Sequence, residues 1–105
     1  MQENSIGNET VVQTEVNQML TLSTAHITEG ACMLLEADSL PLIVYPKDVY
    51  GFFIVVPEED EIADEKLSIP ECLLDILAFA EKQGVDWIML DCDAEPLYDL
   101  PIYDW

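Results

Sequence analysis

The chain contains no arginine and only three lysines, against 22 aspartates and glutamates in 105 residues, so its formal net charge is −19. Proteins that bind nucleic acid or anionic lipid neutralise phosphates with clustered lysine and arginine side chains. Three scattered lysines cannot do this. The composition therefore excludes direct binding of nucleic acid by the usual electrostatic route, and it excludes docking on an anionic membrane surface.

Glycine, cysteine and histidine are scarce as well. The four glycines form no P-loop and no dinucleotide-binding motif, and no HExxH sequence is present. The three cysteines, Cys32, Cys72 and Cys92, are an odd number without a CxxC pair, and each has apolar neighbours. This pattern favours small buried side chains over a disulfide framework or a zinc site. We therefore expect no cofactor and no dedicated metal site.

Long apolar runs are also missing, although half of the residues are hydrophobic. A membrane-spanning helix needs roughly 20 apolar residues, and no stretch approaches that length. The first ten residues are acidic and polar, unlike a signal peptide, so we expect a cytoplasmic protein. The apolar content predicts a folded domain rather than an acidic disordered tail.

The pattern along the chain predicts a flexible N-terminal arm over residues 1–17 and one α+β domain over residues 18–105. Alternation of apolar and polar residues predicts a strand over 20–24. Thr28 is a predicted N-cap for a short helix over about 29–37. Two apolar, β-rich runs, 40–46 and 52–56, are expected to form a hairpin.

The clearest helix follows Ser68, which is expected to form a capping box with Glu71. Apolar residues then recur at helical spacing from Leu73, and Gly84 marks the helix end. A further strand is expected over 86–91. The resulting order, β-α-β-β-α-β, predicts an antiparallel sheet with two helices on one face, in a ferredoxin-like or related sandwich.

The only histidine, His26, lies close to two hydroxyl side chains. Ser23 or Thr24 could act as a nucleophile with His26 as its base, which gives a small hydrolase as one alternative. Hydroxyl and histidine side chains at this spacing are also typical of turns and caps, and we favour that structural role. We therefore expect no catalytic residue and no enzyme.

Asp91, Asp93 and Glu95 alternate in a way that resembles oxygen ligands for a divalent cation. An EF-hand loop needs about 12 residues with a central glycine, and this stretch lacks that completion. The sequence therefore predicts no metal site here.

The negative charge is distributed unevenly. Residues 1–47 carry a net charge of −5 and residues 48–105 carry −14. The stretch 58–65 has six acids in eight residues, which predicts an exposed loop. A second set follows the last predicted strand. The predicted partner-binding residues are Glu58, Glu59, Asp60, Glu61, Asp64, Glu65, Asp91, Asp93, Glu95, Asp99 and Asp104, with Tyr98, Tyr103 and Trp105 as interface aromatics.

Four short motifs resemble a family of small uncharacterised acidic proteins of bacterial plasmids, phages and integrated elements, often encoded near antirestriction genes. The motifs are LSTAHIT (22–28), LIVYP (42–46), YGFF (50–53) and LPIYDW (100–105). The resemblance spans residues 20–105 and brings no activity with it. It implies an accessory protein of a mobile element.

Charge and context together favour a non-enzymatic binding protein. Its carboxylates could imitate nucleic acid, so that it would inhibit a host defence system of the restriction or CRISPR type (antirestriction or anti-CRISPR activity). The expected partner is a basic host protein that handles nucleic acid. An antitoxin-like partner of a basic protein is a further alternative. We expect a monomer or a small homo-oligomer.

Overall fold

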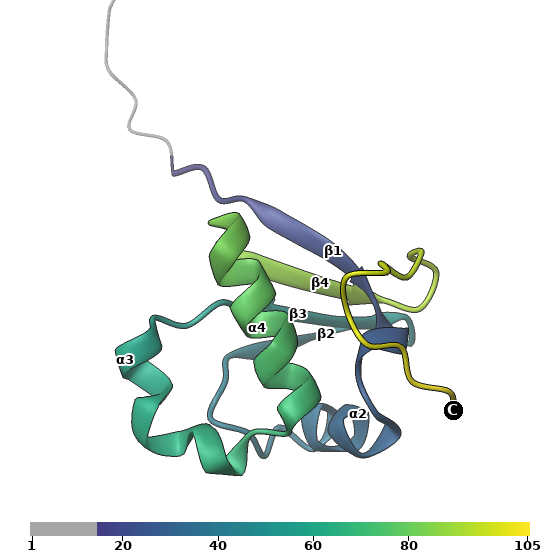
Figure 1. Ribbon diagram of the computed structural model, residues 1–105, viewed down its shortest axis with the longest axis horizontal. Helices are drawn as coiled ribbons and strands as arrows, with labels where there is room; N and C mark the ends of the chain where they lie inside the picture. The colour runs from purple at the N-terminus through teal and green to yellow at the C-terminus, as the bar shows by residue number, and fades with distance from the viewer. Residues whose placement is uncertain (1–14) are drawn as a thin grey trace, which may run out of the picture.

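The computed structural model describes residues 15–105, in which helices pack against one face of a four-stranded sheet (Figure 1). Residues 1–14, most of the predicted arm, lie outside the described residues. The strands are β1 (Met19–Ser23), β2 (Val44–Lys47), β3 (Gly51–Val55) and β4 (Trp87–Asp91). The helices are α2 (Glu29–Glu36), α3 (Glu59–Ile62) and α4 (Glu71–Gln83), with 3₁₀ turns η1 (Thr24–His26) and η2 (Ala63–Ser68).

The α+β class and the main element order are confirmed, but the predicted strand arrangement is wrong. The sheet order is β1-β4-β3-β2, and β1 pairs with β4 in parallel. A ferredoxin-like sheet would place β1 in the interior. Here β4 takes the interior position because Ile88 and Leu90 are fully buried, whereas Leu20 on β1 is only partly buried at the edge. The other two pairings are antiparallel, so the sheet is mixed.

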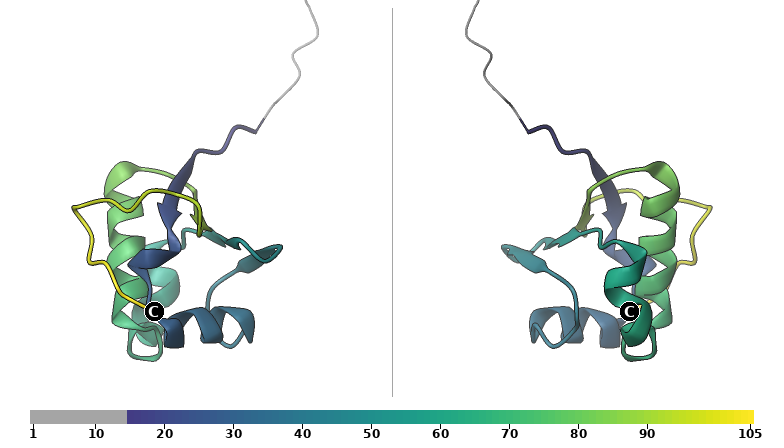
Figure 2. Two further views of the ribbon diagram at one scale, coloured as in Figure 1. Left: turned by 90° about the vertical axis from the view of Figure 1, so that its right-hand side faces the viewer. Right: turned by 90° about the vertical axis from the view of Figure 1, so that its left-hand side faces the viewer.

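One face of the sheet forms the hydrophobic core. Leu22, Leu90 and Phe52 lie in one register row across it, and the buried side chains of α2 and α4 join the same cluster. The opposite face carries Phe53, Met89 and Tyr45 among others. These three are half-buried or exposed, and no helix covers them in Figure 2.

Two helix ends lie where the local sequence predicts them. The hydroxyl of Thr28 accepts a hydrogen bond from the Ala31 N–H at 3.1 Å and caps α2. Gly84 ends α4 with a φ of 72°, the left-handed conformation that glycine adopts without strain. The predicted capping box at Ser68 is wrong. Its hydroxyl donates to the Glu65 carbonyl at 2.7 Å, which closes η2, and Pro70 precedes α4 instead.

Two predicted boundaries also change. Only the second half of the 40–46 run is a strand. The acidic stretch 58–65 is helical rather than a loop, because Ile62 is buried in the core and anchors it. The Glu58 N–H donates to the Glu61 carboxylate at 2.8 Å, and acidic side chains suit the start of a helix. Across residues 15–105, no helix combines the length and the apolar character needed to span a membrane.

Candidate functional site

The C-terminal tail, residues 92–105, is fastened across η1. The Leu97 N–H donates to Nε2 of His26 at 2.9 Å, and Nδ1 of His26 lies 2.7 Å from the Pro101 carbonyl. The Tyr103 N–H donates to the Ala25 carbonyl at 2.7 Å. The Trp105 indole N–H donates to the Ile27 carbonyl at 2.8 Å. Two of the motifs, LSTAHIT and LPIYDW, therefore meet in space.

This arrangement gives His26 a structural role. A neutral imidazole offers one donor and one acceptor. Pro101 requires Nδ1 to donate and Leu97 requires Nε2 to accept, so both nitrogens are occupied. The side chain is only 1% exposed. Within residues 15–105 no carboxylate hydrogen bonds to it, so the geometry does not support the hydrolase alternative with Ser23 or Thr24 as nucleophile.

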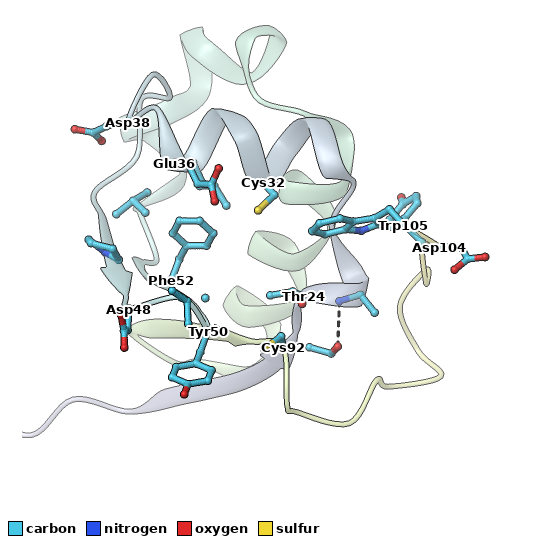
Figure 3. Close-up of a pocket in the computed structure, with 18 residues that line it drawn as sticks. Thr24, Cys32, Glu36, Asp38, Asp48, Tyr50, Phe52, Cys92, Asp104 and Trp105 are labelled. Atoms are coloured by element: carbon cyan, nitrogen blue, oxygen red, sulfur yellow. Dashed lines mark hydrogen bonds between the residues drawn. The ribbon is translucent and has the colours of Figure 1, made fainter.

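Between α2, the β2–β3 hairpin and the tail lies a cavity of about 750 Å³, which we call the tail cavity (Figure 3). Aromatic rings from Tyr50, Phe52, Tyr103 and Trp105 line it, together with four carboxylates and two thiols. Figure 3 shows Phe52 on one side and Trp105 on the other, with Cys32 of α2 between them and Glu36 of α2 beside Phe52. Its lining residues run from Ser23 to Trp105, up to 82 positions apart, so no local pattern in the sequence points to it.

The potential in the tail cavity is negative. Burial raises the pKa of the Cys32 thiol, and the charges of Glu36 and Glu29 raise it further because they disfavour a thiolate. The side chains of Cys32 and Glu36 both point into the cavity from α2, whereas those of Asp38 and Asp104 point outward at its rim. No lysine or histidine is among the described residues that line it.

This potential is measurable through the reactivity of Cys32. In a Cys92→Ser background, we expect the cationic aminoethyl methanethiosulfonate to modify Cys32 faster than the anionic sulfonatoethyl reagent. The rate constant for the cationic reagent divided by that for the anionic reagent should be about tenfold larger for Cys32 than for free 2-mercaptoethanol, because a negative cleft concentrates cations. Glu36→Gln should reduce the preference. Equal rates for the two reagents would contradict a negative cavity.

The structure places the two predicted acidic sets at different ends of the molecule. The acidic segment, residues 58–65, lies on α3 and η2, away from the tail in Figure 1. The two opposite views of Figure 2 show the tail in front in one and α3 in front in the other. Helix α4 lies between them, and Asp75 on α4 lines a shallow groove together with Asp99. The two sets therefore do not form one compact patch.

The three predicted interface aromatics have different surroundings. Tyr98 is 99% exposed at the turn of the tail. Tyr103 is half-buried against the core, and Trp105 is held by its bond to Ile27. Only Tyr98 presents its whole ring to solvent.

Within residues 15–105, Asp91, Cys92 and Asp93 are the one group of three whose ligand atoms could meet a metal ion. Lys47 already pairs with Asp91 at 2.9 Å, and the Asp93 N–H donates to the same carboxylate at 2.8 Å. These two contacts lower the pKa of Asp91. Glu95, which the sequence pattern grouped with the two aspartates, is not in this cluster. Asp91 therefore takes part in an ion pair with Lys47 and in a turn with Asp93.

Comparison with known families is informative for the part of the chain that forms this domain. Residues 19–105 match the family described as "Family of unknown function (DUF5983) C-terminal domain". The chain belongs to this family. The match begins at the first residue of β1 and includes both segments that the tail contacts join. No curated protein and no solved structure matches the chain.

Proposed function

We propose that the protein is a non-enzymatic binding protein that recognises a basic, nucleic-acid-handling protein through its acidic segment. Residues 15–105 contain 20 of the 22 carboxylates, and 18 of them are exposed. Two of the three lysines are already used within the molecule, Lys47 with Asp91 and Lys66 with Glu59. This unneutralised surface is the observation that supports the proposal.

The acidic segment is suited to this role because it is ordered. Its carboxylates are held by short helical turns rather than a mobile loop, and Ile62 anchors the turns in the core. Fixed carboxylates can occupy positions that a nucleic-acid-binding protein uses for phosphates, and complementary potential speeds the encounter. The plasmid and phage context implied by the motifs is consistent with a partner in host defence, of the restriction or CRISPR type.

The test removes charge without removing structure. Glu58 and Glu61 cap α3, and Glu59 pairs with Lys66, so these three stay unchanged. Asp60→Asn, Asp64→Asn and Glu65→Gln together should lower capture of basic proteins from a bacterial lysate by about tenfold. Capture by the unaltered protein should fall steeply as salt rises, because exposed charges are screened.

The control carries the same change in net charge elsewhere. Glu15→Gln, Glu29→Gln and Glu81→Gln alter exposed carboxylates outside the acidic segment, and this triple variant should retain capture. The captured partner should also lose its own nucleic acid when the protein is added. Equal loss of capture by both triple variants would contradict a specific role for the acidic segment.

A further inference from the structure

The tail cavity combines features that select for one kind of ligand. Its volume, about 750 Å³, falls within the range of roughly 300–1,000 Å³ that is typical of ligand sites. Aromatic rings form part of its wall, and all of its charged lining groups are carboxylates. An anion would be repelled by the Glu36 carboxylate, which points inward, and a purely apolar ligand would leave this carboxylate facing it without a partner. The lining favours a cation.

Two side chains, those of Glu36 and Ser23, indicate where the charge of that cation would lie. The carboxylate of Glu36 points inward from α2 beside Phe52, and Cys32 lies between it and Trp105 (Figure 3). Ser23 also lines the cavity, although it is only 4% exposed. Its Oγ accepts one hydrogen bond, from the Ala25 N–H at 3.0 Å, and a hydroxyl oxygen can accept a second.

The rings are positioned for a flat cation. Phe52 is buried in the core and lines the cavity with little of its surface, whereas Trp105 is 55% exposed and is held in place by its hydrogen bond to Ile27. A guanidinium group stacks on such rings with its face and pairs with a carboxylate through its edge. An ammonium group is more strongly hydrated and has no flat face to stack. Tyr50 already interacts with an internal cation, because Lys47 Nζ lies 5.4 Å from its ring centroid.

We propose that the tail cavity binds an alkylguanidinium group, which pairs with Glu36 and stacks on Trp105. None of the 105 residues can supply this group, because the sequence contains no arginine. Its source is either an arginine side chain of a bound protein or a free small guanidine, and the size of the cavity admits both. The site lies between α2 and the tail, so it does not depend on the acidic segment.

The test is a titration of the ¹⁵N-labelled protein followed by NMR. The probes are a capped Gly-Arg-Gly peptide for the protein source and agmatine for the small-molecule source. We expect saturable shifts at the Trp105 indole N–H and at the amides of Cys32 and Glu36. A peptide with citrulline in place of arginine has nearly the same shape without the charge, and it should cause no shifts. A lysine peptide should bind at least about fivefold more weakly.

The variant Glu36→Gln should weaken the binding of the arginine peptide by about fivefold or more, because it removes a charge-assisted contact. The substitution should not disturb folding, since Glu36 is exposed at the end of α2, where a negative charge is unfavourable. Glu29→Gln is the matched control. Glu29 lies on the same helix and is exposed, but it does not line the cavity, and its charge raises the pKa of Cys32 less than the charge of Glu36 does.

Tighter binding of the peptide than of agmatine would assign the site to a protein arginine, and the reverse would assign it to a small guanidine. Three results would overturn the proposal. These are equal binding of the citrulline and arginine peptides, equal effects of Glu36→Gln and Glu29→Gln, and shifts spread over all exposed carboxylates. The triple variant of the acidic segment should bind the peptide normally, so this test is independent of the proposed function.

Discussion

Replacement of His26 by phenylalanine is expected to lower the free energy of unfolding by about 2–4 kcal/mol, because it removes two hydrogen bonds at a buried position. Phenylalanine fills a similar volume but offers no donor for the Pro101 carbonyl and no acceptor for the Leu97 N–H. The tail must then either keep unpaired polar groups or detach. Detachment would expose Leu100, which is buried in the core cluster.

Urea unfolding measures this loss, and hydrogen exchange locates it. The Leu97 amide should exchange faster in the variant, as should the Tyr103 amide that bonds to Ala25. Tyr98→Ala is the control, because Tyr98 lies on the same tail and is fully exposed. It should change stability by less than about 0.5 kcal/mol. If His26→Phe were as stable as the unaltered protein, the role assigned to the imidazole would be wrong.

The second large effect is expected at Gly51, the first residue of β3. A Cβ atom added there would lie 1.7 Å from the Leu90 carbonyl oxygen and 2.6 Å from its carbon. Both are backbone atoms of the neighbouring strand, so no side-chain movement can relieve the overlap. Gly51→Ala should therefore cost about 3 kcal/mol or more, because β3 and β4 must separate.

Gly30 provides the matched control for this substitution. A Cβ at Gly30 meets nothing within 4 Å, and the residue lies in α2. Gly30→Ala should raise stability by about 0.5–1 kcal/mol, since alanine favours the helix. Thermal unfolding of both variants shows directly whether each substitution raises or lowers the stability of the protein. A stable, well-folded Gly51→Ala protein would contradict the close β3–β4 approach.

Features that depend on neighbours in sequence could be predicted from the sequence. The helical spacing after Leu73, the Thr28 cap and the Gly84 helix end are of this kind, and the structure confirms each. The charge of the acidic segment predicts an exposed loop, but the segment is helical. One apolar residue, Ile62, is enough to fasten a helical turn there.

Features that depend on distant partners could not be predicted. The strand order follows from β1 pairing with β4, which lies 68 positions later. The role of His26 follows from backbone groups 71 and 75 residues away. The tail cavity requires α2, the hairpin and the tail together, so Cys32 and Glu36 gave no signal by themselves. The only hint was that LSTAHIT and LPIYDW, at opposite ends of the domain, both belong to the resemblance.

Two sets of contacts close almost the whole domain into one loop. One joins η1 to the tail, and the other joins β1 to β4. Bringing such distant segments together costs entropy that nearby contacts cannot offset early in folding. Helix α4 can form quickly by itself, but the sheet edge and the tail cavity must wait for this closure. Folding should therefore be slow for a chain of this size, and the tail cavity should appear in the same kinetic step as the parallel strand pair.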